Sequence, residues 1–153
     1  MREHMGLFRG KRIDNGEWVE GYLFGVWEKA YILWGTTNGV PNMLEVDPNT
    51  VGECTGMRDK NGKLIFEGDI LQREGCGKSS VVHTAKYHEI YGVWYVGSRL
   101  RGQESMSLLA LTRVLYEIIG NIHDNPELKG LSREHKRHSK REPGNRSVGE
   151  EGI

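Results

Sequence analysis

The sequence predicts a small fold of the mostly-β class, and three observations support this prediction. The 153 residues include 21 glycines and only 4 prolines, a composition typical of short strands joined by tight turns. Asn61-Gly62 is a pair that tolerates left-handed backbone angles, so we expect a type I′ hairpin turn there. Short β-branched or aromatic runs recur between turn residues, as in strands. The length is that of one domain with a single core.

The first expected hairpin lies in the N-terminal third of the chain. Residues 16–24 alternate in the manner of a strand, which places Trp18, Glu20 and Tyr22 on one face. Residues 30–34 are an apolar and aromatic run that we expect to pair with this strand.

A second group of elements follows the Asn61-Gly62 turn. Residues 64–66 continue from it as a strand, Glu67-Gly68-Asp69 breaks that strand, and a new strand begins at Ile70. A break of this kind occurs at the corner of a small β-barrel.

Two further hairpin strands and a closing strand are expected in the C-terminal half. Residues 81–87 and 93–96 are β-branched or aromatic runs that predict a hairpin. Residues 116–122 predict a final strand, whereas 108–111 are too few to assign. In 125–128 the proline is placed to begin a helical turn.

The composition changes after residue 130. Residues 131–153 are rich in Lys, Arg and His, and their only aliphatic side chains are Leu131, Val148 and Ile153. Such a segment buries too little apolar surface to offset the entropy lost on ordering. The sequence therefore predicts a β domain over residues 1–130 and a basic, disordered tail over 131–153.

Charge and hydropathy indicate which partners and which cellular compartment to expect. Lys and Arg total 21, as do Asp and Glu, so attraction to nucleic acid or an anionic membrane would need a local patch. The sequence has no apolar run of about 18 residues and no secretory signal at its start, which predicts a cytoplasmic protein without membrane contact. Cys54 and Cys76 are expected to be reduced in that compartment.

Three separated motifs occur in order along the chain. They are Phe8-Arg9-Gly10-Lys11-Arg12 with the following residues 15–21, residues 55–70, and Ile119-Gly120-Asn121-Ile122-His123-Asp124-Asn125-Pro126-Glu127-Leu128. Together they span about residues 7–128 and resemble the YopX-like family of phage and prophage proteins. The resemblance implies an SH3-like β-barrel or roll with added hairpins and short helical turns. It supplies no catalytic residue and no cofactor.

Most of the motif residues are expected to shape turns. These candidate structural residues are Asp59, Asn61, Gly62, Glu67, Gly68, Asp69, Gly120, Asn121, Asn125 and Pro126. Glu67 and Asp69 could instead hold a metal or act as an acid–base pair. We favour turn formation, because acidic residues beside a glycine commonly accept hydrogen bonds from nearby backbone N–H groups. For Asp59 we expect a role in bracing its loop.

No recognised catalytic pattern is present in the sequence. His83, His88 and His123 have no zinc-ligand spacing with either cysteine, and the common hydrolase and nucleotide-binding motifs are absent. We therefore expect a protein that is not an enzyme and holds no metal or cofactor.

Binding is the remaining class of function, and two kinds of partner are open. Most Trp and Tyr rings are expected to pack in the core or across strands. Trp27 and Tyr91, near predicted loops, are candidates for a peptide groove or for stacking on bases. Arg9, Lys11 and Arg12 form a basic strip in sequence that, with the tail, could bind nucleic acid. We expect a protein-binding or self-assembling module, a homo-oligomer in the latter case, because the net charge is zero.

Overall fold

The computed structural model of the protein describes residues 6–73, 82–100, 103–108 and 116–130. The predictions for Cys76, for most of 108–111 and for the tail 131–153 fall outside these residues.

The described chain is built almost entirely of β-strands. They are β1 (Leu7–Lys11), β2 (Trp18–Val26), β3 (Lys29–Thr37), β4 (Val40–Val46), β5 (Gly52–Arg58), β6 (Leu64–Phe66), β7 (Asp69–Arg73), β8 (Val82–His88), β9 (Val93–Leu100), β10 (Gln103–Leu108) and β11 (Tyr116–Asn121). Short 3₁₀ turns occur at η1 (Pro48–Thr50) and η4 (Pro126–Gly130). The predicted mostly-β class is confirmed.

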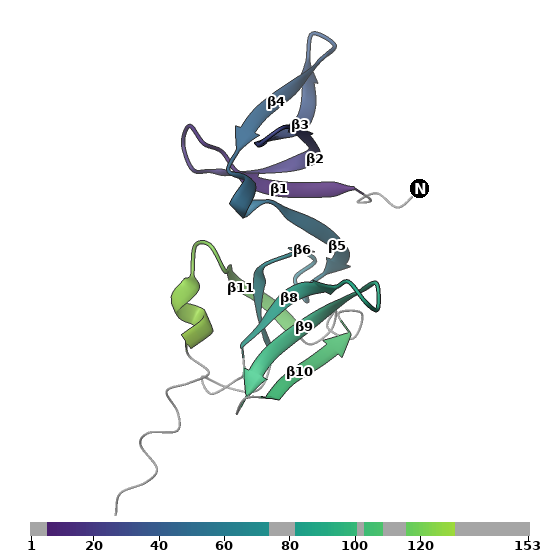
Figure 1. Cartoon of the computed structure of the whole chain (residues 1–153), viewed down its shortest axis with the longest axis vertical. Coiled ribbons are helices and arrows are strands. Elements are labelled where there is room, and N and C mark those ends of the chain that lie inside the picture. The colour runs from purple at the N-terminus through teal and green to yellow at the C-terminus, as the bar shows by residue number, and fades with distance from the viewer. Residues whose placement is uncertain (1–5, 74–81, 101–102, 109–115, 131–153) are drawn as a thin grey trace, which may run out of the picture.

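The strands form two antiparallel sheets and no closed barrel. One sheet has the order β4-β3-β2-β1-β5-β6 and the other the order β10-β9-β8-β7-β11. Figure 1 shows β1 to β4 at one end of the molecule, β7 to β11 at the other, and β5 running between them. Just after β1, the chain meets the end of β4 at an isolated Arg12–Val46 bridge, with backbone hydrogen bonds from Ile13 to Glu45 and from Asp47 to Lys11. That contact is too short to close the six-stranded sheet, so the expected barrel is wrong.

Pairing registers confirm the expected hairpins. Tyr22 lies opposite Leu33 in the β2–β3 pair, and Tyr87 lies opposite Trp94 in the β8–β9 pair. Strands β1 and β4 were not expected, because Gly10 and Pro41 interrupt their apolar patterns.

Among the residues that the structure describes, buried apolar side chains form two separate clusters, one in each half of the molecule, whereas the chain length predicts one core. Ala30, Ile32 and Val46 form the core of the β1–β4 part. The larger core, beneath the second sheet, contains Ile65, Leu71, Ala85, Val96 and Tyr116. The two halves must therefore be held together by something other than one continuous core.

The turn at Asn61-Gly62 is a hairpin turn, but not of type I′. Gly62 has φ +82°, whereas Asn61 is not left-handed, and a type I′ turn requires positive φ at both central residues. The Gly62 N–H donates to the Asp59 carbonyl at 3.0 Å and the Asp59 N–H to the Lys63 carbonyl at 2.8 Å. This is the three-residue loop in which a type I turn is followed by a left-handed residue.

Replacing Gly62 with valine is expected to destabilise the protein by about 1–2 kcal/mol, because a β-branched residue is strained in the left-handed region. No atom lies within 4 Å of the Cβ position, so the effect isolates backbone strain from crowding. Gly62→Asn, which tolerates positive φ, serves as the matched variant and should lose less. Equal thermal midpoints for the valine variant and the unchanged chain would contradict this assignment.

Candidate functional site

A network of polar and stacking contacts joins the two halves of the molecule, and we call it the polar seam. Its members are Arg9, Lys11 and Trp18 from the first half with Phe66, Asp69 and Asp124 from the second. The first motif supplies Arg9, Lys11 and Trp18, the second supplies Phe66 and Asp69, and the third supplies Asp124. All three motifs therefore meet at the polar seam.

Arg9 forms the buried part of the polar seam. Its guanidinium Nη2 lies 2.6 Å from Asp69 Oδ1, and the residues are 8% and 1% exposed. The guanidinium carbon lies 4.7 Å from the Trp18 ring centroid and 5.0 Å from that of Phe66. Arg9 is thus held by one carboxylate and two rings, and it is not part of an exposed basic strip.

Asp69 also fixes the turn that precedes it. Its Oδ2 accepts the Phe66 N–H at 2.9 Å, and between them Gly68 has φ +83° with Ile122 packed against it. Burial raises the pKa of Asp69, and the Arg9 guanidinium opposes that rise. One carboxylate therefore serves both the turn and the contact between halves.

Glu67 contributes through its backbone. Its carbonyl accepts a hydrogen bond from Arg9 at 3.4 Å, and its N–H donates to Glu53 at 2.9 Å. Burial, and then the Glu53 carboxylate, raise the pKa of the Glu67 side chain. The Arg9 guanidinium thus lies between the Glu67 carbonyl and the Asp69 carboxylate.

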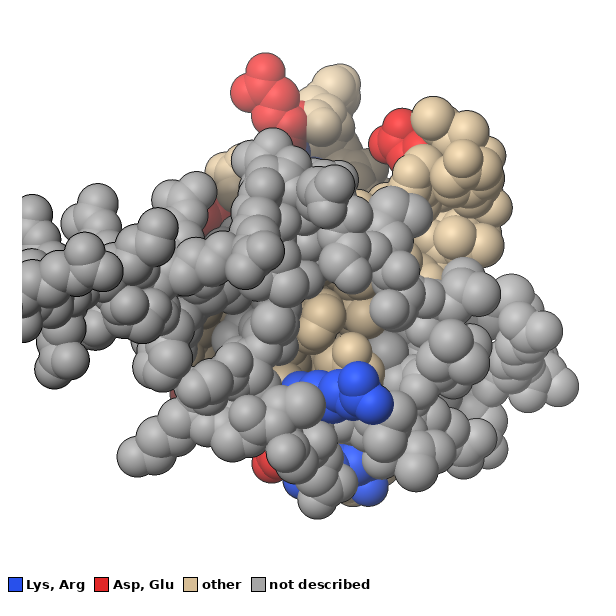
Figure 2. Space-filling view, turned by 90° about the horizontal axis from the view of Figure 1, so that it is seen from below, with Lys and Arg blue, Asp and Glu red and all other residues tan. Residues whose placement is uncertain are grey.

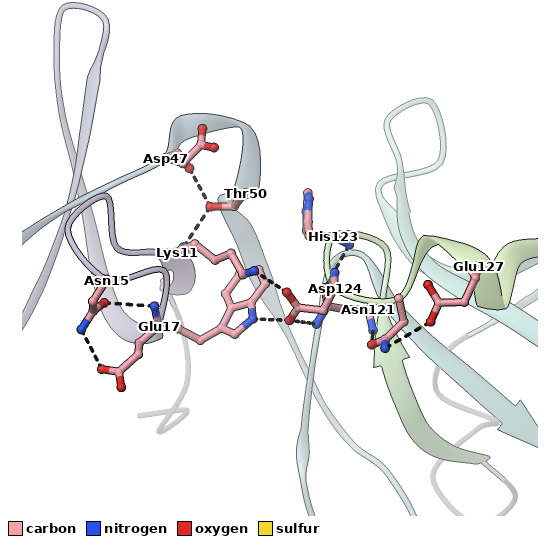
Figure 3. Close-up of polar contacts among 11 residues, drawn as sticks. Lys11, Asn15, Glu17, Asp47, Thr50, Asn121, His123, Asp124 and Glu127 are labelled. Carbon is pink, nitrogen blue, oxygen red and sulfur yellow. Dashed lines mark hydrogen bonds and ion pairs between the residues drawn. The ribbon is translucent and has the colours of Figure 1, made fainter.

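Asp124, in the turn after β11, forms the outer part of the polar seam. Figure 3 shows Lys11 reaching to its Oδ1, with Asn121 beside it. Oδ2 accepts from the Trp18 indole at 2.7 Å and from the Asn121 amide at 2.9 Å. The hydrogen bonds from Lys11, Asn121 and Trp18 hold the pKa of Asp124 well below its usual range.

Acid is expected to weaken this outer contact. Because the pKa of Asp124 is lowered on folding, its ionised form contributes stability that is fully present above the ordinary value of 3.8 and is lost as the pH falls below it. We expect Asp124→Asn to be less stable than the unchanged chain at pH 7, and the difference to shrink at about pH 2.5. Urea unfolding at both pH values measures this. A difference independent of pH would contradict the assignment.

Asp59 lies at a second junction, between the β5–β6 turn and β11. Its Oδ1 accepts the N–H groups of Asn61 and Lys63, both at 2.9 Å, and its Oδ2 accepts the Ile118 N–H at 3.2 Å. The carboxylate, which is buried with its residue only 4% exposed, fixes the loop and attaches it to the last strand.

The third motif forms the turn that presents Asp124. The Asn121 side chain accepts the N–H groups of His123 and Asp124 at 3.0 and 2.9 Å, and the Asn125 side chain accepts the Asn121 N–H at 3.3 Å. Gly120 packs directly beneath Asn125, where a Cβ atom would lie 2.8 Å from the Asn125 Cγ. Pro126 then begins η4.

The three histidines lie in different surroundings, each beside an aromatic ring. His83 packs on Tyr116, His88 on Tyr91 and Tyr95, and His123 on Trp18. Within the described ranges, no three His, Cys, Asp or Glu side chains are placed to share a metal ion. Cys54 is a buried thiol, and burial raises its pKa.

The basic strip expected at the N-terminus is paired within the molecule. Lys11 contacts Asp124, and Arg12 holds Asp14 through two hydrogen bonds of 2.5 and 2.9 Å. With Arg9 buried, the three side chains do not form a free cationic surface, because folding brings a carboxylate to each.

Trp27 and Tyr91 are both exposed and lie in hairpin turns. Trp27 is 98% exposed and has φ +52° at the first loop position between β2 and β3. Such a conformation is strained for a bulky residue. Tyr91 is 69% exposed in the β8–β9 turn and stacks on His88 at 4.6 Å.

A group of aromatic and aliphatic side chains lies on one side of β2, β3 and β4, and we call this the outer face. It consists of Tyr22, Phe24, Tyr31, Leu33 and Met43. Residues directly opposite in antiparallel strands project to the same side, and the register pairs Tyr22 with Leu33, Leu33 with Met43, and Phe24 with Tyr31. The core residues Ala30 and Ile32 alternate with these and project to the other side.

The outer face is open to solvent. Tyr22, Phe24 and Met43 are 61%, 48% and 54% exposed, and Tyr31 and Leu33 are half-buried. Exposure does not exclude the expected cross-strand packing, since Tyr87 is exposed and packs on Trp94 across the β8–β9 pair at 5.1 Å between ring centroids. Sequence alternation placed Tyr22 on a face with Trp18, but no sequence signal indicated that this face would be left uncovered.

Comparison with known proteins identifies the family of the chain. Residues 7–129 match the family model described as YopX protein, and the chain belongs to this family. The crystal structure of protein EF1440 from Enterococcus faecalis is similar at 24% sequence identity and a TM-score of 0.44, over 80% of this chain and 96% of that one. No curated protein matches. The helices of the described ranges include none long and apolar enough to cross a membrane.

Proposed function

We propose that this YopX-family chain is a phage- or prophage-encoded accessory protein that acts in the bacterial cytoplasm by binding protein, and not by catalysis. The observation that supports this proposal is the outer face, where three large apolar side chains stand open beside two half-buried ones. Fully burying one such side chain is worth roughly 1.5–3 kcal/mol. A partner that covers the outer face gains this energy several times over.

The contacts of the charged motif residues also support binding over catalysis. Asp59 and Asp69 each accept two or more hydrogen bonds from their own molecule, and Asp124 is held by Lys11, Trp18 and Asn121. These groups stabilise the fold that presents the outer face.

Site-specific photocrosslinking tests the proposal. A benzophenone side chain at Phe24 places the reactive group on the outer face, and the same group at Lys63, exposed in the β5–β6 turn, is the matched control. In the bacterium that encodes the chain, we expect a protein adduct from position 24 and none from position 63. The mass of the adduct distinguishes another copy of the chain from a different protein. A folded, expressed position-24 variant that yields no adduct would refute the proposal.

Nucleic-acid binding by the N-terminal basic residues is less favoured than protein binding, because Arg9, Lys11 and Arg12 each pair with a carboxylate. In the view of Figure 2 the described Lys and Arg side chains occupy a small area bordered by grey residues.

Salt dependence separates this alternative from protein binding. Each phosphate contact adds roughly 0.7–0.9 to the slope of log affinity against log salt. We expect weak oligonucleotide binding with a shallow slope, unchanged when the tail residues Arg133, Lys136, Arg137, Lys140 and Arg141 become glutamine. Fluorescence anisotropy at two salt concentrations measures the slope. Micromolar binding that is steep in salt and lost in the glutamine variant would favour nucleic acid instead.

A further inference from the structure

The polar seam already shows how this side of β2 holds a cation. Trp18 and Tyr22 lie on the same side of β2, four residues apart, and Lys11 and Arg9 lie opposite Trp18 and Glu20 on β1. Both cations stack on the Trp18 ring, Arg9 at 4.7 Å and Lys11 at 5.6 Å from its centroid. A ring with a neighbouring carboxylate is therefore the arrangement by which this surface binds basic side chains.

The same arrangement continues onto the outer face, where no Lys or Arg of the described residues stacks on Tyr22. Glu20 lies between Trp18 and Tyr22 on this side of β2 and is exposed. Its cross-strand neighbour Arg9 is directed to Asp69 instead, and Glu20 has no ion pair with any residue the structure describes. The carboxylate and the open Tyr22 ring are thus adjacent and available.

A second ring, that of Phe24, lies two residues further along β2 on the same side, and a second carboxylate lies across the sheet from it on β4. Phe24 is opposite Tyr31, which is in turn opposite Glu45 on β4. Glu45 is paired with Lys29 at 3.0 Å, and Glu28 borders this end in the β2–β3 turn. The border of the outer face therefore carries three carboxylates, Glu20, Glu28 and Glu45, against one ammonium group.

We infer that the outer face binds an extended segment of a separate partner protein that carries arginines two positions apart, an inference that rests on the proposed protein-binding function. Tyr22 and Phe24 are separated by two residues of a strand, about 7 Å, which is also the spacing of alternate side chains in an extended partner. One guanidinium stacks on Tyr22 and pairs with Glu20, and the other stacks on Phe24. Arginine suits this site better than lysine because its planar group both stacks on rings and binds carboxylates.

The segment comes from a separate protein because the three arginines of residues 6–66, the part of the chain that carries the outer face, are already engaged. Arg9 binds Asp69, Arg12 binds Asp14, and Arg58 donates to the Gly62 carbonyl at 2.7 Å. A second copy would have to release such contacts before it could supply these side chains.

Titration of the full chain with two short peptides tests the inference. The probes are acetyl-Gly-Arg-Ser-Arg-Gly-amide and the same peptide with citrulline, which has the shape of arginine without its charge. We expect the arginine peptide to shift the backbone NMR signals of β2 and β3 and to bind at least tenfold more tightly than the citrulline peptide. Equal affinity for the two peptides, or shifts confined to other strands, would overturn the inference.

Matched variants locate the contacts. Tyr22→Leu keeps an apolar side chain and removes the ring, and Glu20→Gln removes only the charge, so each should weaken the arginine peptide roughly two- to fivefold. Tyr91→Leu and Glu89→Gln make the same changes in the exposed β8–β9 turn and should leave affinity unchanged. Unchanged affinity in both outer-face variants, with their spectra otherwise intact, would also overturn the inference.

The two proposals fail separately. An adduct from position 24 combined with equal binding of the two peptides would leave protein binding in place and refute arginine recognition. An adduct consisting of two copies of this chain would likewise retain protein binding and refute the separate partner. Absence of any adduct from position 24 refutes the proposed function itself.

Discussion

Replacing Asp69 with asparagine is expected to lower the free energy of unfolding by about 3–5 kcal/mol, because it leaves the Arg9 guanidinium buried without a counter-charge. The pair is 2.6 Å long, and the Asp69 side chain is 1% exposed. The change also alters the acceptor of the Phe66 N–H. Urea unfolding of the full chain at pH 7 measures the loss.

Two further variants separate the buried charge from its position in the turn. Asp14→Asn removes a carboxylate from an exposed pair with Arg12 and should cost less than about 1 kcal/mol. Arg9→Met in the Asp69→Asn background removes the unpaired cation and should recover much of the loss. If the Asp69 and Asp14 variants had equal free energies of unfolding, the buried pair would contribute no more to stability than the exposed pair, which would contradict this prediction.

Gly21→Ala is expected to destabilise the chain by about 1–3 kcal/mol through crowding within the six-stranded sheet. A Cβ atom at Gly21 would overlap the carbonyl oxygen of Leu33 and lie 2.8 Å from the Ile32 Cγ2. The obstacle is the backbone of the neighbouring strand, so it cannot be relieved by a change of rotamer.

Gly25→Ala is the matched control for this crowding. Gly25 is on the same side of β2 as Gly21, and the nearest atom to its Cβ position is the Lys29 carbonyl oxygen at 3.9 Å. Alanine should be neutral or slightly stabilising there, because it reduces the entropy of the unfolded chain. Thermal unfolding compares the two variants, and similar midpoints would contradict the packing at Gly21.

Local patterns in the sequence predict the strands well and their long-range partners poorly. Alternation through Trp18, Glu20 and Tyr22 correctly predicts one face of β2, since a strand repeats every two residues. The same alternation does not identify the paired strand β1, because Gly10 interrupts its apolar pattern. The type of turn at Asn61-Gly62 depends on Asp59, whose carboxylate accepts two N–H groups of the loop.

The candidate binding site was predictable only in part, for the same reason. The exposure of Trp27 and Tyr91 follows from their positions in turns. The burial of Arg9, by contrast, depends on its ion pair with Asp69, which lies 60 residues away in sequence. Exposure of Tyr22 and Phe24 depends on the absence of a packing layer above them. Neither property is encoded in the residues next to these positions.

The separation of the two cores has a consequence for how the protein unfolds. A single core transmits cooperativity through apolar packing, but here the halves communicate through β5 and through the charges and rings around Arg9 and Asp124. These polar contacts, unlike apolar burial, weaken with acid. We therefore expect the side chains around Arg9 and Asp124 to decide whether the two halves unfold together or separately. In this sense the motif residues control the cooperativity of unfolding.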